Sequence, residues 1–229
     1  MLQCLGNNTH PECAHAINAC ARHSVEPRQA HGNALKKIGR CLLGVMDDGL
    51  IIDPQGSMSL DLWVDSDFAG NCVRDDNDDP SSVRSRTGFV VTFGSVPLLW
   101  SSVIQSEIAM STMEAECIAL STAMRKLIQL RAVLFELDEH FKLGMTNKLS
   151  MISTVFEDNR ACRILATADP PRMTPRSKHI AIKHHWFSQH LGDTVVIQDI
   201  ESSKQKADGF TKPLSMDAFQ SWRRVVCGW

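Results

Sequence analysis

Four acidic residues of this chain stand where a carboxylate can take part in chemistry: Asp65, Glu116, Asp158 and Asp208. Carboxylates that converge on one point repel one another and raise each other's pKa. Hard divalent cations such as Mg²⁺ remove that repulsion, because they prefer oxygen ligands and keep water or phosphate at their remaining positions. Two such ions about 4 Å apart can activate water and stabilise the leaving oxygen in phosphodiester cleavage. The four acids together predict a magnesium site, although any one of them alone is equally typical of a turn or an ion pair.

Two of these acids close segments in which residue types alternate along the chain, a pattern typical of a strand. One segment runs from Leu60 to Asp65, and the other runs from Ile152 to Asp158. If the two strands are parallel neighbours, both carboxylates emerge at the same edge of the sheet, where α/β proteins place their ligands.

Glu116 belongs to a long helix that we expect from about Ser111 and Thr112, which are good capping residues, to about Leu137. Steps of three and four residues join Glu116 to an apolar stripe. The stripe consists of Leu120, Ala123, Leu127, Leu130, Leu134 and Leu137. A residue in that stripe points at the sheet rather than at water. Burial of a carboxylate there is costly unless something compensates for it.

The rest of the chain supplies the other elements of an α/β domain. Alternation predicts strands at residues 89–93 and 194–200, and a further strand near residues 97–100 after a turn at Gly94. Asp208 lies in a short helix after the last of these strands. Strands that first form a meander and then mix with helices indicate an α/β fold with a five-stranded mixed sheet flanked by helices.

The two ends of the chain read as helical. Apolar stripes predict one helix after Pro11 and a second that ends near Gly44. We therefore expect a helical hairpin at residues 1–50, the α/β domain at residues 58–214 and a C-terminal helix at residues 215–229.

Composition narrows the classes of function. Of 229 residues, 43% are hydrophobic and 22% are charged, which is ordinary for a soluble globular protein. No apolar run approaches the ~20 residues that span a bilayer, so no membrane partner is expected. Eight scattered cysteines without a Cys-x-x-Cys pair favour reduced thiols over a disulfide frame or a zinc site. The net charge of −2 means that any contact with nucleic acid must come from a local basic patch.

Several strings of the sequence resemble the ribonuclease H domain of copia-type retrotransposon Pol polyproteins. In chain order they are residues 64–70 (VDSDFAG), 85–89 (SRTGF), 99–102 (LWSS), 111–120 (STMEAECIAL), 157–159 (EDN), 176–183 (RSKHIAIK) and 205–214 (QKADGFTKPL). The strings occur in the family's order between residues 64 and 214. Residues 1–50 are similar to the thumb and connection helices at the end of the reverse transcriptase, which precede ribonuclease H in that family.

The resemblance implies a ribonuclease H-like fold and an endonuclease that hydrolyses the RNA strand of RNA–DNA hybrids. It implies that two Mg²⁺ ions, which Mn²⁺ can replace, are bound by four catalytic carboxylates: Asp65, Glu116, Asp158 and Asp208. No small-molecule cofactor is expected. The implied partners are the hybrid and the upstream reverse transcriptase domain of the same polyprotein. The implied location is the cytoplasm, in virus-like particles, or the nucleus, and not the secretory route.

A second set of residues is expected to contact the nucleic acid. Its members are Ser111, Thr112, Asn159, Arg176, Lys178, His179 and Lys183. The basic ones lie between residues 171 and 185, where they could contact phosphates and make binding weaken with added salt, or could form the solvated face of an ordinary helix. Ser111 and Thr112 could bond in the minor groove of the hybrid, where the 2′-hydroxyl marks RNA, or could simply cap the helix.

Three residues depart from the family's pattern: Phe68 replaces Trp, Cys117 replaces Tyr and Ala181 replaces Asp. None of them is a proposed metal ligand. Two other functions stay open, namely a non-catalytic remnant or connection-like module that binds a hybrid or a partner chain, and a nuclease of the integrase or resolvase type. We interpret Asp67 as a supporting residue and Glu114 as a solvated or capping acid.

Residues 45–48 (VMDD) are similar to the catalytic hairpin of reverse transcriptases. Too few residues precede them for the fingers and palm of a polymerase, so we assign them to a turn after a helix. Residues 75–79 are acidic but lack the glycine and glutamate spacing of a calcium loop.

Overall fold

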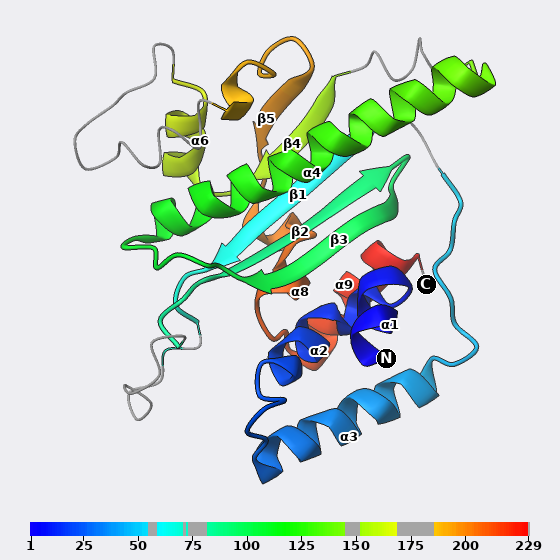
Figure 1. Ribbon diagram of the computed structural model, residues 1–229, viewed down its shortest axis with the longest axis vertical. Coiled ribbons are helices and arrows are strands. Elements are labelled where there is room, and N and C mark those ends of the chain that lie inside the picture. Colours follow the sequence, from blue (N-terminus) through cyan, green and yellow to red (C-terminus); the bar gives the residue numbers. More distant parts are fainter. Residues whose placement is uncertain (55–58, 71, 73–81, 145–151, 169–185, 229) are drawn as a thin grey trace.

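Five strands form one sheet at the centre of the molecule, in the order β3-β2-β1-β4-β5 (Figure 1). The computed structural model describes residues 1–54, 59–70, 72, 82–144, 152–168 and 186–228. The strands are β1 Leu60–Asp67, β2 Arg86–Phe93, β3 Val96–Ile104, β4 Ser153–Glu157 and β5 Val195–Asp199. β1, β2 and β3 are antiparallel neighbours, whereas β4 lies parallel to both β1 and β5. The predicted five-stranded mixed sheet is therefore confirmed, and β1 and β4 are the parallel neighbours that the convergence of Asp65 and Asp158 requires.

One face of the sheet is covered by the long helix α4, Thr112–Phe141, and by α6, Arg160–Ala166 (Figure 1). Alternation along β1 directs Leu62 and Val64 to this face, where they share a core with Leu120 and Leu127 of α4. The expected stripe of α4 is buried in its first half, but Leu137 near its end is 40% exposed. The end of α4 near Glu116 is therefore the end that the core fixes.

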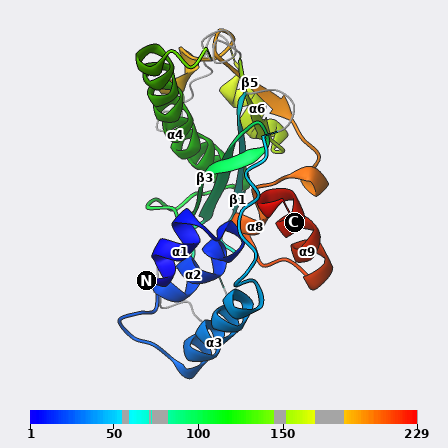
Figure 2. The ribbon, with the colours of Figure 1, turned by 90° about the vertical axis from the view of Figure 1, so that its right-hand side faces the viewer.

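The opposite face of the sheet is covered by helices from both ends of the chain (Figure 2). They are α2 Ala14–Ala21, α8 Asp208–Thr211 and α9 Met216–Cys227, and the short 3-10 helix η2, Ser202–Lys204, precedes α8. Trp63 of β1 and Trp100 of β3 pack on this side with Phe210 of α8 and Trp222 of α9. The indole N–H of Trp222 donates to the carbonyl of Lys206 at 2.7 Å, so α9 holds the segment that leads into α8.

Residues 1–54 form four helices, of which α1 and α2 contact the sheet. Besides α2 they are α1 Leu2–Asn8, which the sequence pattern did not predict, η1 Pro11–Cys13 and α3 Gln29–Gly44, after which residues 45–47 form the expected turn. The indole of Trp100 donates to the carbonyl of Gly6 at 2.7 Å, and the guanidinium of Arg86 donates to Asn18 at 2.7 Å. The Cys227 thiol also donates to the Glu12 carboxylate at 3.5 Å, which ties the two ends of the chain together. The division of the chain into a helical hairpin, an α/β domain and a C-terminal helix, with bounds at residues 50, 58 and 214, stays a prediction.

Two further expectations concern membranes and thiols. In the described ranges, no helix combines the length and the apolar character needed to cross a membrane. All eight cysteines are free thiols, as their scatter along the sequence predicted.

Gly88 of β2 is the point at which α8 comes closest to the sheet. It pairs with Asp65 in the β1–β2 ladder. A Cβ atom at Gly88 would lie 2.6 Å from a methyl carbon of Thr211 and 3.0 Å from the backbone carbon of Phe210. The missing side chain therefore allows α8 to lie directly over the strand position opposite Asp65.

We predict that Gly88→Ala lowers the free energy of unfolding by about 1–3 kcal/mol, because α8 must move away from β2 to admit the methyl group. The matched control is Gly39→Ala in α3, where a Cβ atom meets nothing within 4 Å. Alanine is the better helix former, so the control should be neutral or up to about 1 kcal/mol more stable. Urea unfolding measures both. Equal stabilities of the two variants would show that a methyl group at Gly88 does not clash with α8.

Candidate metal centre

Three carboxylates meet at the end of the sheet where β1 and β4 finish. Asp65 lies in β1 and Glu116 lies in the second turn of α4, while Asp158 is the residue that directly follows β4. One oxygen from each lies within 4.8 Å of the others, and this is the one group of potential metal ligands of its kind in the described part of the chain. The structure therefore brings together three of the four acids that the sequence singled out.

The ladder between β1 and β4 explains why two of these acids meet. Leu62 pairs with Val155 and Trp63 pairs with Phe156. Continued for two residues, this parallel register sets Asp65 beside Asp158. β1 is also the strand from which the chain goes to β2 on one side and, later, to β4 on the other. Ligand sites in open α/β sheets lie at such switch points, beyond the carboxyl ends of the strands.

Asp65 is buried and is contacted from α8. The hydroxyl of Thr211 donates a hydrogen bond to its Oδ2 atom. Burial raises the pKa of Asp65 to about 7, and the charges of Asp208 and Asp158 act in the same direction. Thr211 and the ammonium of Lys212 oppose that rise. A carboxyl group in this position keeps its proton more readily than an exposed aspartate, unless a cation is bound.

Glu116 is 6% exposed, and its Oε2 atom has no hydrogen-bond partner among the described residues. Burial raises its pKa well above the usual range, and the neighbouring carboxylates of Glu157, Asp65 and Asp158 raise it further. A buried carboxylate oxygen without a partner is costly for a protein. This oxygen, next to two other carboxylates, fits a hard divalent cation with oxygen ligands, and so the donor set suits Mg²⁺ or Mn²⁺.

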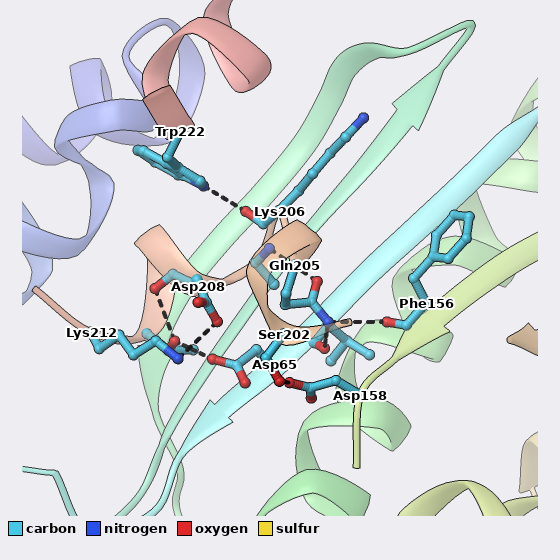
Figure 3. A network of polar contacts seen from close by, with 12 residues as sticks. Asp65, Phe156, Asp158, Ser202, Gln205, Lys206, Asp208, Lys212 and Trp222 are labelled. Atoms are coloured by element: carbon cyan, nitrogen blue, oxygen red, sulfur yellow. Dashed lines mark hydrogen bonds and ion pairs between the residues drawn. The ribbon is translucent and has the colours of Figure 1, made fainter. Parts of the chain in front are cut away.

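Asp158 is held by the segment between β5 and α8. The hydroxyl of Ser202 donates to its Oδ2 atom at 2.6 Å (Figure 3). Ser202 is the first residue of η2, so this 3-10 helix helps to fix the carboxylate.

Asp208 lies near the three-acid group but outside it. Its Oδ1 atom forms an ion pair of 2.9 Å with the ammonium of Lys212, one turn further along the chain (Figure 3). Burial raises the pKa of Asp208, and Lys212 opposes the rise. The assignment of Asp208 as a fourth metal ligand therefore stays a prediction.

A fifth acid, Glu157, was not among the candidates from the sequence. It is fully buried at the end of β4, where its Oε1 atom accepts the N–H of Asn159 at 3.0 Å. Its Oε2 atom has no partner among the described residues, and burial raises its pKa. Alternation could have found it, because Ser153, Val155 and Glu157 are the buried positions of β4.

Gln205 was also missed as a site residue. Its side-chain amide donates to the carbonyls of Val64 at 3.0 Å and Phe156 at 3.4 Å, which directly precede Asp65 and Glu157. Its Oε1 atom accepts the N–H of Ala207 at 3.2 Å. Gln205 thus bridges the two parallel strands at the point where the acids begin. A glutamine in a loop carries no pattern that reveals this, apart from its place in the string 205–214.

The expected nucleic-acid contacts fall into two groups. Ser111 caps α4 by accepting the N–H of Glu114 at 3.2 Å, while Thr112 is the first residue of α4 and is exposed. Asn159 caps α6 by accepting the N–H of Cys162 at 3.0 Å. The capping interpretation of Ser111 is confirmed, and contact with nucleic acid stays a prediction for all three residues. The other four lie outside the described residues: Arg176, Lys178, His179 and Lys183.

Glu114 and Asp67 lie outside the three-acid group. Glu114 is buried rather than solvated, and its Oε2 atom accepts the N–H of Met110 at 2.9 Å, which closes the turn before α4. Asp67 is the last residue of β1, and burial raises its pKa.

Comparison with known proteins finds relatives along almost the whole chain. Over 219 residues, or 95% of the chain, it is 31% identical to the retrovirus-related Pol polyprotein from transposon RE2 of Arabidopsis thaliana. It is 30% identical over the same length to the corresponding polyprotein from transposon RE1 of that plant. The chain spans 14% of the length of each of these relatives. A solved structure of LC11-RNase H1, isolated from compost, is similar at a TM-score of 0.46 and 17% identity, over 72% of this chain and 97% of that one. No family model matches the chain.

The raised pKa of Asp65 predicts how the stability of the metal-free protein depends on pH. The folded protein favours protonated Asp65, so the stabilisation is complete below the unfolded pKa of about 4 and is lost as pH rises through about 7. Asp65→Asn has no such proton to lose. We predict that the free energy of unfolding of the wild type, relative to Asp65→Asn, falls between pH 4 and pH 8. Chemical unfolding in EDTA measures the difference. A difference that stays constant or rises with pH would contradict the burial of this carboxylate.

Proposed function

Since this chain is a homologue of the retrovirus-related Pol polyproteins of transposons, we propose that it is a ribonuclease H-like nuclease that hydrolyses the RNA strand of RNA–DNA hybrids. The observation that carries the proposal is the group of three carboxylates, from β1, α4 and β4, at the carboxyl ends of two parallel strands. A module that only binds nucleic acid has no need of buried acids in this arrangement, because carboxylates repel phosphate.

The proposed roles of the chain's own residues follow from their positions. Asp65, Glu116 and Asp158 would hold divalent ions, with Asp208 at the margin of the group. Bound Mg²⁺, or Mn²⁺ in its place, would supply an activated water and stabilise the leaving oxygen. Thr211 and Ser202 each hold one carboxylate oxygen, so the remaining oxygens of Asp65 and Asp158 are oriented for ligation. The products would be 3′-hydroxyl and 5′-phosphate ends, as the resemblance of the motifs implies.

The relatives also suggest the partners of the site. The hybrid would be the substrate, and the reverse transcriptase of the same polyprotein would be the covalent neighbour, acting in the cytoplasm or in the nucleus. Ser111, Thr112 and Asn159 all lie within a few residues of a carboxylate of the group, which supports a role for them at the edge of the substrate site.

We predict that Asp158→Asn lowers hybrid cleavage by about 100-fold or more, because a metal ligand contributes several kcal/mol to the stabilisation of the transition state. Binding of the hybrid should change little, since the residues that contact phosphate are untouched. Glu201→Gln is the matched control, because Glu201 is an exposed acid of the neighbouring segment that pairs with Lys204. The measurement is single-turnover cleavage of a labelled hybrid, with binding followed by fluorescence anisotropy. Full activity of Asp158→Asn in Mg²⁺ would refute the ligand assignment.

Substrate class and metal dependence are tested together on the wild type. We expect cleavage of the RNA strand of a labelled hybrid in Mg²⁺, no cleavage in EDTA, and no cleavage of double-stranded RNA or DNA. Cleavage that persists in EDTA would exclude the metal mechanism. Cleavage of double-stranded DNA would indicate an integrase-type or resolvase-type activity, and tight hybrid binding without cleavage would indicate a non-catalytic module.

A further inference from the structure

The site contains a positively charged side chain, Lys212. Lys212 directly follows α8, and its ammonium forms the 2.9 Å ion pair with Asp208. The side chain of Lys212 is 43% exposed and that of Asp208 is 19% exposed, so the pair lies half inside the protein. Figure 3 shows the ammonium beside the carboxylates of Asp208 and Asp65.

The field of the other acids reaches this ammonium. Burial lowers the pKa of Lys212, but Asp208, Asp65 and Asp158 together raise it above its usual value, in agreement with its position at the edge of the three-acid group. Thr211, the residue before Lys212, donates to Asp65 and lies with its Oγ1 atom 3.0 Å from the carbonyl of Asp208. Residues 208–212 therefore form one turn that carries both the carboxylate of Asp208 and the ammonium of Lys212.

We propose that Lys212 is a positioning residue that competes with a divalent cation for Asp208. The ammonium holds the Asp208 carboxylate in an ion pair outside the group formed by Asp65, Glu116 and Asp158. A divalent ion can use Asp208 as a ligand only after it displaces this ammonium. The three-acid group is thus the stronger cation site, and the position that uses Asp208 is the weaker one.

The reason is electrostatic. A fixed positive charge a few ångströms from a cation site disfavours a second cation, and the cost grows where the site is shielded from water. Lys212 also occupies one of the two oxygens that Asp208 can offer to a metal. Both effects weaken metal binding at Asp208 more than metal binding at Glu116, which the ammonium does not contact. This inference rests on the proposed metal site, but it does not depend on which nucleic acid is cleaved.

The experiment measures binding of Mn²⁺ to the whole chain at pH 8, by calorimetry and by electron paramagnetic resonance, without nucleic acid. The wild type should bind Mn²⁺ in a strong and a weak step. In Lys212→Gln the weak step should tighten by about three- to fivefold, the effect expected when one partly buried ion pair is removed. Lys212→Arg keeps the charge and should keep the weak step near that of the wild type.

Two further variants make the result specific. Lys204→Gln removes the same charge from an exposed lysine that pairs with Glu201, and it should leave both steps unchanged. In Lys212→Gln with Asp208→Asn, the tightening should vanish, because the competed ligand is gone. Circular dichroism on each variant confirms that it is folded. A structural role alone would move the thermal midpoint without the selective change in the weak step.

The outcomes separate this inference from the proposed function. An unchanged or weaker second step in Lys212→Gln overturns the competition, and so does equal tightening in Lys204→Gln. Absence of Mn²⁺ binding by the wild type overturns both proposals. Selective tightening in a protein that does not cleave hybrids supports the role of Lys212 and refutes the hybrid nuclease.

Discussion

The parallel pairing of β1 with β4 is the constraint on which the site depends. Its register sets Asp65 beside Asp158, and no other pairing of these strands would do so, because a slip of one residue turns a side chain to the opposite face. The pairing is short, and the amide of Gln205 extends it by bonding the carbonyls of both strands just before the acids. A buried glutamine that satisfies two strand carbonyls also prevents the cost of leaving them unpaired. The strand ends are therefore fixed by side-chain contacts as well as by the ladder.

The acids are held together against their own repulsion, and rigid surroundings make that possible. Glu116 and Glu157 each have an oxygen without a partner in the described part of the chain, and the pKa values of both are raised. The apolar core beneath α4 fixes the helix that carries Glu116, so this carboxylate cannot turn toward water. Electrostatic preorganisation of this kind stores unfavourable energy in the metal-free protein, and a cation would release it. Buried carboxylates at this point lower the stability of the metal-free protein. Their presence is therefore better explained by the binding of a cation than by a contribution to stability.

How far the sequence predicts this arrangement depends on whether a residue follows a periodic pattern. Asp65, Asp158 and Glu116 follow from strand alternation and from a helical stripe, and the structure brings all three together. Glu157 also follows from strand alternation, but only its neighbour Asp158 was predicted as a site residue. The strands themselves were predicted, although β1 runs on to Asp67 and the helix α1 at the N-terminus carries no clear stripe.

The position of Asp208 could not be predicted, because only tertiary contacts orient α8, a helix of four residues. Those contacts come from distant parts of the chain: the absent side chain of Gly88 admits the helix to the sheet, and Trp222 of α9 packs edge-on against Phe210 at 5.2 Å. The ring of Trp222 also lies so close to Gly209 that a Cβ atom there would meet it at 2.3 Å. The C-terminal helix and β2 therefore determine where the last carboxylate of the set stands. A change in either element reaches Asp208 through α8 and reaches Asp65 through the hydrogen bond from Thr211, whereas the backbone positions of Asp65, Glu116 and Asp158 are set by the sheet and α4.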